Sequence, residues 1–274
     1  MNFVMNLHTQ PRTFYFTRHG QSIYNQSGKI GGDSGLSKAG VEYARRLAKY
    51  AHEVIAKTAI EEGDELVLER NVVPARLWTS TLLRTIETAE FIEHPAVPHS
   101  LDSGLKLDWL QFRPMARRNL DEIYAGVCDG MTYKEIETQF PDEFERRQKD
   151  KLSYRYPRGE SYMDVILRLE PLAHEMERSQ EALLIIGHQG ILRILYAYFM
   201  GLSRDDAPYV NIPLNTVIKL TPYADVCEEE RICLMNKEEM LNDGQDEPIT
   251  SMPIGPDTQA RYALNDPIMN APSH

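Results

Sequence analysis

The chain has 274 residues, of which 42% are hydrophobic, so it can bury one substantial core, and one domain with appendages is favoured over two domains. Its formal net charge of −11 argues against nucleic acid as a partner, because binding to a phosphate backbone requires a broad basic face. The sequence has no run of about 18 apolar residues, no leader pattern, no even cysteine framework and no Cys-x-x-Cys pair, so we expect a cytoplasmic protein that contacts no membrane.

The first predicted element is a short aromatic strand, Phe14-Tyr15-Phe16-Thr17, which stops at Arg18, His19 and a glycine. His19 should therefore lie at the C-terminal tip of this strand, where open α/β sheets bind their ligands. A single histidine is often a surface or a satisfied core residue, so this motif alone does not decide between catalysis and a structural role.

Helices and strands are predicted to alternate over the next segments. Ser37 is placed to cap a long helix with an apolar face, and Arg84 falls in the first turn of a later helix. The predicted elements are a helix from 38 to about 62, a charged surface insertion at 61–71, a strand at 75–80, a helix at 82–92 and a third strand at 97–101.

Residues 103–160 are less regular, with helical patches at 132–139 and 142–151. An ordered excursion of this length between strands is typically functional. Ser161 and Asp164 have capping-box spacing before an amphipathic helix, in which Pro171 should introduce a bend.

A second apolar strand, 182–187, ends on His188, and a helix is predicted to begin at Gln189 and Gly190. Two strands that each bring a histidine to the same edge of a sheet predict one shared site. Two more strands are predicted at 216–223 and 232–235.

The composition changes at about residue 236, after which five prolines and several acidic residues occur with little periodicity. We therefore expect one domain at 1–235 and a mobile tail at 236–274.

Several motifs, in a characteristic order, resemble the histidine phosphatase superfamily: Arg18-His19-Gly20, Arg84 after a Trp-Thr-Ser-Thr run, a mid-chain glutamate and a late Gly-His-Gln. Further blocks at 30–33, 120–128, 154–162 and 213–220 extend the similarity, over residues 3 to about 235, to the fructose-2,6-bisphosphatase domains of the bifunctional 6-phosphofructo-2-kinase/fructose-2,6-bisphosphatase family. The resemblance implies a three-layer α/β/α sandwich with a mostly parallel mixed sheet, the phosphoglycerate mutase-like fold, and a helical lobe over the site at 103–160.

Hydrolysis of a phosphate ester needs a nucleophile, cations around the transferred oxygens and an acid for the departing alkoxide. The resemblance makes His19 the nucleophile that forms a phosphohistidine, which requires that its other ring nitrogen be engaged as a donor. It makes Glu122 the general acid, which must carry a proton near neutral pH. The groups expected to clamp the phosphoryl group are Arg18, Arg84, His188 and Asn25.

The same residues have ordinary explanations. Arg84 is spaced for an ion pair with Glu87 on its own helix, and Glu122 beside Asp121 would usually be a solvated acidic patch. Without the resemblance, these explanations would be favoured.

A second phosphate on the substrate would need its own cationic pocket. Arg147 and Lys151 have i,i+4 spacing and could share a helix face, although residues 146–151 also read as an exposed charged helix. Gly31 could lend a backbone amide to the reacting phosphate. The resemblance assigns the second pocket to Tyr133, Arg147, Lys151, Tyr162, Gln189 and Arg193.

Three positions depart from the family pattern: Gln21 stands in place of glutamate, Gly187 in place of cysteine and Gly190 in place of alanine. None of them removes a proposed catalytic group, but they put the efficiency of turnover in question. The eight histidines show no metal-ligand spacing, so no metal or other cofactor is expected.

These observations predict a phosphatase that converts fructose 2,6-bisphosphate to fructose 6-phosphate and phosphate. Residues 1–12 match the junction between the kinase and phosphatase halves, and the chain has no P-loop motif, so a covalently linked kinase domain would lie outside it. The alternatives are a phosphoglycerate mutase or broader sugar-phosphate phosphatase, or a metabolite-sensing module without catalysis.

Overall fold

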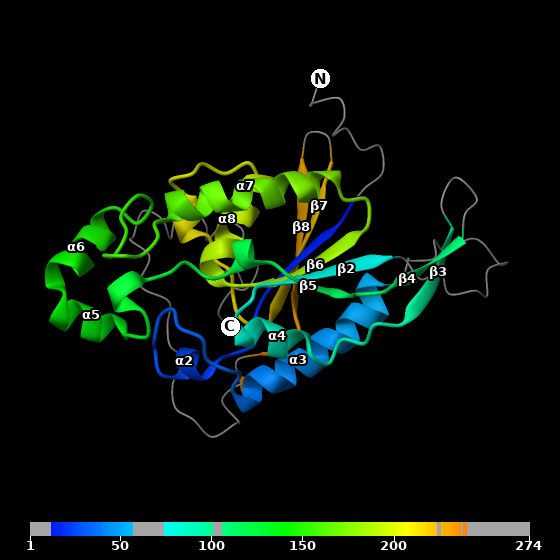
Figure 1. Ribbon diagram of the computed structural model, residues 1–274, viewed down its shortest axis with the longest axis horizontal. Coiled ribbons are helices and arrows are strands. Elements are labelled where there is room, and N and C mark those ends of the chain that lie inside the picture. Colours follow the sequence, from blue (N-terminus) through cyan, green and yellow to red (C-terminus); the bar gives the residue numbers. More distant parts are fainter. Residues whose placement is uncertain (1–11, 57–73, 101–105, 224–225, 237, 240–274) are drawn as a thin grey trace, which may run out of the picture.

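A six-stranded mixed sheet forms the centre of the molecule in the computed structural model, which describes residues 12–56, 74–100, 106–223, 226–236 and 238–239 (Figure 1). The strand order is β5-β2-β6-β1-β7-β8. The first four strands run parallel, and β7 and β8 are antiparallel to their neighbours. The strands are β1 (Phe14–Arg18), β2 (Ala75–Thr79), β5 (Pro114–Ala116), β6 (Ala182–Gly187), β7 (Thr216–Pro222) and β8 (Cys227–Cys233).

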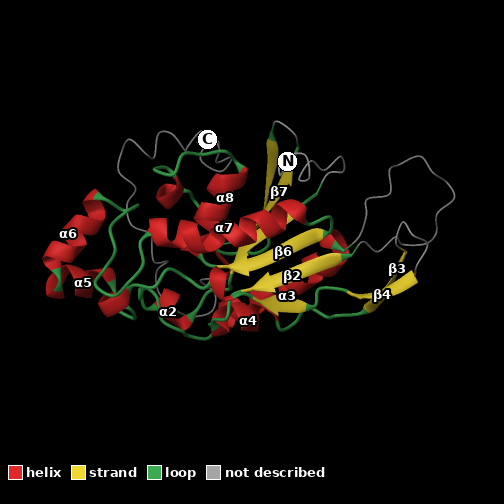
Figure 2. Ribbon diagram, turned by 45° about the horizontal axis from the view of Figure 1, so that its top comes forward, coloured by secondary structure: helices red, strands yellow, loops and turns green. Residues whose placement is uncertain are grey.

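Helices cover both faces of this sheet, as Figure 2 shows. Phe14 and Phe16 of β1 point into one core, and Tyr15 between them points into the other, because successive strand residues face opposite sides. The three-layer α/β/α sandwich is therefore confirmed. The first core is shared with α7 (Tyr162–Arg178) and α8 (Gln189–Phe199), and the second with α3 (Lys38–Tyr50) and α4 (Leu83–Ala89).

A helical lobe extends from one end of the sandwich and has a small core of its own (Figure 1). Cys128, Ile136 and Tyr156 are buried at its centre. It contains η3 (Gly126–Cys128), α5 (Tyr133–Gln139) and α6 (Pro141–Lys149), whereas η2 (Arg118–Leu120) packs through Leu120 in the first core of the sandwich.

The predicted third strand does not join the central sheet. Instead, β3 (Ala96–Ser100) pairs antiparallel with β4 (Lys106–Leu110) in a separate two-stranded sheet, which projects from the end opposite the lobe (Figure 1). Only a few residues separate these two strands, whereas a parallel neighbour in the main sheet would need a crossover of a dozen or more. The sequence prediction also missed β4 and β5, the second of which begins at a proline and has only three residues.

Helix starts agree with the predicted caps. The Ser37 hydroxyl accepts the Gly40 amide at the start of α3, and Ser161 and Asp164 form a reciprocal capping box at the start of α7. Pro171 lies inside α7, which continues past it to Arg178. After α3 the helix runs into η1, a π-helical turn at Ala51–Ile55.

Some predictions fall outside the described residues: the helix beyond 56, the insertion at 61–71, residue 101 of the third strand, nearly all of the segment 1–12, and the tail from 240. Within the part of the chain that the structure describes, no helix is both long and apolar enough to cross a membrane.

Candidate active site

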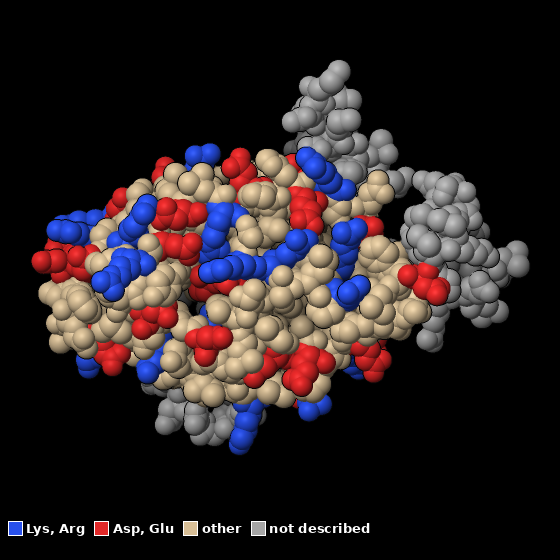
Figure 3. Space-filling view, in the orientation of Figure 1, with Lys and Arg blue, Asp and Glu red and all other residues tan. Residues whose placement is uncertain are grey.

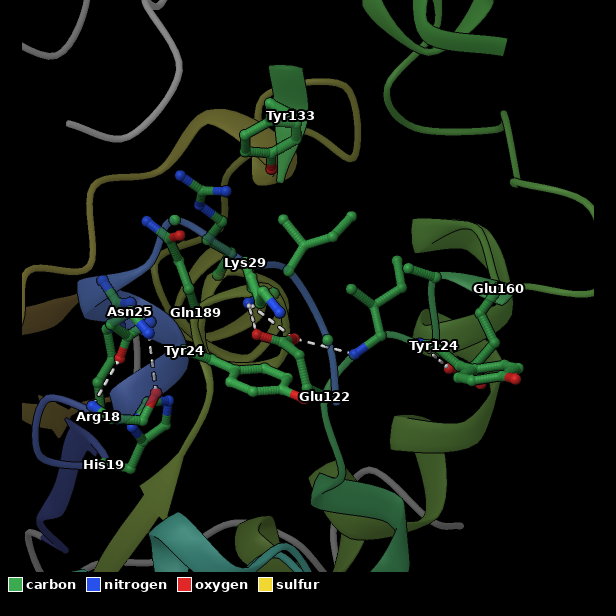
Figure 4. A pocket seen from close by; sticks show the side chains of 18 of the residues that line it. Arg18, His19, Tyr24, Asn25, Lys29, Glu122, Tyr124, Tyr133, Glu160 and Gln189 are labelled. Carbon is green, nitrogen blue, oxygen red and sulfur yellow. Dashed lines mark hydrogen bonds between the residues drawn. The ribbon is translucent and has the colours of Figure 1, made fainter. Parts of the chain in front are cut away.

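A cavity of about 300 Å³ lies where the sheet meets the lobe (Figure 4). The strands β1 and β6 are parallel neighbours in which Arg18 is paired with Gly187, so the residues that follow them, His19 and His188, leave the sheet side by side. The strand β2 ends at the same edge and is followed by Ser80 and then by the helix α4 that carries Arg84.

The two histidines meet across one guanidinium group. Their ring centroids lie 5.1 Å apart, and Arg84 Nε is 3.1 Å from His19 Nε2 and 3.2 Å from His188 Nδ1. Because an arginine Nε can only donate, both of these ring nitrogens act as acceptors and carry no proton. The Arg84 side chain is fixed further by a 2.7 Å bond from Nη1 to the Gly32 carbonyl oxygen.

Each imidazole is held by its other nitrogen. His19 Nδ1 lies 2.7 Å from the Gly20 carbonyl oxygen, which can only accept, so Nδ1 carries the proton and Nε2 keeps its lone pair. His188 Nε2 lies 2.7 Å from the Ser80 hydroxyl oxygen. Burial, followed by the charges of nearby arginines, lowers the pKa of both histidines well below the ordinary value, so both rings are neutral at physiological pH. The partner that His19 requires is thus a backbone carbonyl, which no sequence pattern could have named.

Arg18 lies half-buried beside this pair. Its Nη1 donates to the Ile212 carbonyl oxygen at 3.1 Å, while its Nε is buried without a partner among the described residues. Burial lowers the pKa of Arg18 to about 10, so its side chain remains charged at neutral pH. The alternative ion pair of Arg84 with Glu87 does not form, because Glu87 accepts the Leu36 amide at 2.6 Å.

Asn25 and Gly31 line the wall of the cavity below the lobe. Asn25 lies in α2 (Ile23–Gln26), and its Oδ1 accepts the Ser22 amide at 3.0 Å. Gly31 has a φ of +65°, and a Cβ there would overlap the Asp129 carboxylate, which accepts the Gly32 amide at 2.9 Å. Only glycine fits this close approach of the wall to the lobe.

Glu122 lies at the cavity surface between the histidine end and the lobe (Figure 4). Its Oε1 accepts the Ile123 amide at 2.9 Å and the Gly190 amide, in the first turn of α8, at 3.2 Å. A Cβ on residue 190 would lie 2.6 Å from this oxygen, so an alanine at this position, where glycine departs from the family pattern, would require the Glu122 side chain to shift. Asp121 points elsewhere and accepts both the amide and the hydroxyl of Thr81.

Four of the six residues assigned to a second pocket interact with one another: Arg193, Tyr162, Arg147 and Lys151. Arg193 Nε donates to the Val210 carbonyl oxygen at 2.7 Å, and its Nη1 lies 3.2 Å from the Tyr162 hydroxyl oxygen. Arg147 lies over the Tyr162 ring, 5.9 Å from its centroid. Burial, together with Arg193 and Arg147, lowers the pKa of Lys151 to about 7. Tyr133 and Gln189 line the same cavity.

The predicted helical pairing of Arg147 with Lys151 is wrong. The helix α6 ends at Lys149, and Asp150 has a non-helical backbone with φ −138° and ψ 82°, so Lys151 enters the cavity from a turn. The Lys151 ammonium group instead lies 4.9 Å from the centroid of the Tyr209 ring, in η4 (Ala207–Tyr209).

The cavity is strongly basic although the whole chain is acidic. Acidic and basic side chains are intermixed over the face shown in Figure 3. By contrast, six cationic and two acidic side chains line the cavity: Arg18, Lys29, Arg84, Arg147, Lys151 and Arg193 against Glu122 and Glu160. The described residues contain no group of three or more His, Cys, Asp or Glu side chains arranged to hold a metal ion.

Sequence reasoning missed several residues of this site. Ser80, which holds His188, gave no signal beyond its place after a strand. Tyr209 lies far along the chain in an irregular segment, and Lys29 stands in no motif that points to this site. Gln21 and Gly187 have packing roles: Gln21 Oε1 accepts the Ser37 hydroxyl at 2.8 Å, and Gly187 faces the side chain of Leu192.

A family model described as "Histidine phosphatase superfamily (branch 1)" matches residues 64–234 of this chain. Over 232 residues the chain is 44% identical to "6-phosphofructo-2-kinase/fructose-2,6-bisphosphatase 3" of Rattus norvegicus, covering 85% of this chain and 36% of that protein. It is 45% identical over 222 residues to "Fructose-2,6-bisphosphatase" of Saccharomyces cerevisiae, covering 81% of this chain and 42% of that protein.

The chain therefore spans less than half the length of these two relatives. Among solved structures, a putative alpha-ribazole-5'-P phosphatase from Escherichia coli has the same fold, with a TM-score of 0.63, 16% identity and coverage of 81% of this chain and 95% of that one.

Proposed function

Because this chain belongs to the histidine phosphatase superfamily, we propose that it removes the 2-phosphate of fructose 2,6-bisphosphate through a phosphohistidine on His19, yielding fructose 6-phosphate and phosphate. The relatives that carry the name fructose-2,6-bisphosphatase support this substrate, since they are 44% and 45% identical to the chain over most of its length.

In the proposed reaction, the lone pair of His19 Nε2 attacks the phosphorus atom as the bond to the C2 oxygen breaks. The protonated Glu122 carboxyl gives its proton to that departing oxygen and then takes one from the water that cleaves the phosphorus–nitrogen bond. Arg18, Arg84, His188 and Asn25 hold the transferred oxygens, and the Gly31 amide assists them. The N–H of Arg84 that now lies between the two imidazoles would turn to a phosphate oxygen.

One observation carries the choice of a doubly phosphorylated sugar: the cations of the cavity extend from the histidines to the lobe. Arg18 and Arg84 lie with the histidines, Arg147 and Lys151 lie toward the lobe, and the charge of Arg193 acts on both Arg18 and Lys151. A monophosphate at the histidines would leave the partly buried cations toward the lobe without a counter-charge, which is costly. We assign the 6-phosphate to this group, together with Tyr133, Tyr162 and Gln189.

We propose in addition a domain at 1–235 followed by a mobile tail, a place in the cytoplasm, no cofactor, and a kinase half joined to this domain in the full protein. The name of the rat relative, which combines both activities, supports the kinase half.

The test is phosphate release from fructose 2,6-bisphosphate in the presence of a chelator, with capture of labelled phosphate on the protein. His19→Ala should abolish both turnover and acid-labile label, because it removes the imidazole that is the proposed nucleophile. His174→Ala, which removes an exposed histidine of α7, is the matched control and should behave as the wild type.

Two results would count against the proposal. Label retained by His19→Ala would disprove the assigned nucleophile. Faster turnover of 2,3-bisphosphoglycerate than of fructose 2,6-bisphosphate would disprove the assigned substrate.

A further inference from the structure

The segment that carries Glu122, residues 119–124, has little regular structure of its own. Apart from the end of η2 it contains no helix or strand, so its position depends on contacts with its surroundings. Among the described residues, the side chain that donates the most hydrogen bonds to this segment is Arg168, in the second turn of α7.

Arg168 binds this segment through several backbone oxygens at once. Its Nη1 donates to the Asn119 carbonyl oxygen at 2.5 Å, and its Nη2 donates to that of Asp121 at 2.7 Å and lies 3.4 Å from that of Glu122. In return, the Asn119 side-chain amide donates to the Arg168 carbonyl oxygen at 2.6 Å. The planar guanidinium group thus fixes the backbone directly before and at the proposed acid.

The same arginine also fixes the far end of the segment. Arg168 Nε and Nη2 lie 2.9 and 3.1 Å from the two carboxylate oxygens of Glu160, a bidentate pair. Glu160 Oε2 accepts the Tyr124 amide at 3.0 Å, and the Glu160 amide donates to the Tyr124 carbonyl oxygen at 2.8 Å. Figure 4 shows this Tyr124–Glu160 contact beyond Glu122 at the cavity wall.

A third anchor is independent of Arg168. The Asp121 carboxylate accepts the amide and hydroxyl of Thr81, in the turn between β2 and α4. Removal of Arg168 would leave the segment held at Thr81, at the buried Leu120 and at the Tyr124–Glu160 backbone bond, but would free the backbone carbonyl oxygens of Asn119, Asp121 and Glu122 from their shared donor.

We propose that Arg168 is a positioning residue for Glu122: it sets where the proton donor sits relative to the departing oxygen, without touching substrate. The inference rests on the proposed role of Glu122. A displacement on the order of 1 Å can cost about a hundredfold in rate, because proton transfer requires hydrogen-bond reach.

The variants are Arg168→Met and a matched control, Arg117→Met. Both arginines form an ion pair that joins α7 to a neighbouring segment, Arg168 with Glu160 and Arg117 with Glu175, and their side chains are 22% and 26% exposed. Loss of Arg168 should cost more stability, as measured by thermal unfolding, because it also frees three backbone carbonyl oxygens. Only Arg168 holds the segment of Glu122.

The first readout is a double-mutant cycle with Glu122→Gln. Arg168→Met should lower kcat for the bisphosphate about tenfold to a hundredfold with KM changed less than about threefold, and Arg117→Met should change kcat less than about threefold. In the Glu122→Gln background, Arg168→Met should cost less than about twofold more, because the group that it positions is already gone. Equal losses in both backgrounds would show a merely structural role.

The second readout is the dependence on the leaving group, measured as the single-turnover burst of phenol release from phenyl, 4-nitrophenyl and 2,4-dinitrophenyl phosphates. The defect of Arg168→Met should be largest for phenyl phosphate and nearly vanish for the dinitrophenyl ester, which needs no proton. The same loss for all three esters, or the same pattern in Arg117→Met, would overturn the proposal.

The two proposals fail in different ways. If the wild type does not cleave fructose 2,6-bisphosphate, the substrate assignment is wrong. The double-mutant cycle, run with phenyl phosphate, and the series of aryl phosphates then still test the role of Arg168. If the bisphosphate is cleaved but the cycle is additive, only the role of Arg168 is lost.

Discussion

At the scale of single residues, each of the two histidines is held by a different hydrogen-bonding partner. A carbonyl oxygen fixes the proton of His19 on Nδ1, and a hydroxyl group contacts His188 at Nε2, so that unprotonated nitrogens of both rings face the same guanidinium N–H. Burial keeps both rings neutral. His19, the proposed nucleophile, should therefore stay available well below neutral pH.

Lys151 predicts a pH dependence at the other end of the cavity. Its pKa of about 7 in the empty site means that it loses its charge as the pH rises through 7. A bound phosphate favours the charged form, so KM for the bisphosphate should rise by up to about tenfold per pH unit above 7, while kcat stays level.

Steady-state kinetics from pH 6 to 9 checks this expectation. Lys151→Arg is the comparison, because arginine stays charged over the whole range and should give a flat KM. A wild-type KM that does not change with pH would rule out the expected titration of Lys151.

At the scale of elements, residues 28–32 form one wall of the cavity, and this wall contacts the lobe at Gly31, where only glycine fits. Gly31→Ala should destabilise the protein by about 1–3 kcal/mol and raise KM, since a Cβ would overlap Asp129 in addition to straining a positive φ.

Gly201→Ala is the matched control for Gly31→Ala. Gly201 has the same φ of +65°, but a Cβ added there would have no atom within 4 Å, so its substitution measures the backbone strain alone. Denaturant unfolding of both variants gives the difference that is due to the contact with Asp129. Equal losses of stability would show that this contact contributes nothing.

Local signals in the sequence located most of the central elements. The apolar runs before His19 and His188 predicted β1 and β6, and Ser37 and Ser161 marked the starts of α3 and α7. The prediction failed where the outcome depends on distant partners. Val97 gives no sign that its strand pairs with β4 outside the main sheet, and nothing near Lys149 shows that α6 stops there.

The same limit applies to the site. The histidines and arginines stand in motifs and could be named in advance, but their geometry could not. The backbone carbonyl that holds His19, the glycine amide that binds Glu122, and the contacts of Arg168 all join parts of the chain that only the fold brings together.

At the scale of the whole molecule, an acidic chain collects six cations around one cavity. Their mutual repulsion destabilises the empty site, so an anion that binds there should stabilise the fold. At a concentration of 100 times its Kd, a ligand contributes about 2.7 kcal/mol, which should raise Tm by roughly 5–10 °C.

Thermal unfolding of His19→Ala with fructose 2,6-bisphosphate measures this effect without turnover. Fructose 6-phosphate should shift Tm less, because it occupies only one of the two cationic ends, and fructose should shift it least. Equal shifts for all three sugars would refute electrostatic stabilisation by the cavity.

The place of β1 between β6 and β7 has a consequence for how the protein is made. The ribosome delivers Phe14 before the two strands that flank it, which start at Ala182 and Thr216, roughly 170 and 200 residues later. At typical translation speeds this aromatic segment waits roughly 10 to 30 s or more without its permanent neighbours, exposed to chaperones and to other nascent chains. A transcript cut short before the final strands would thus yield a product that contains His19 but has no pocket around it, so hydrolysis begins only after synthesis of this domain is essentially complete.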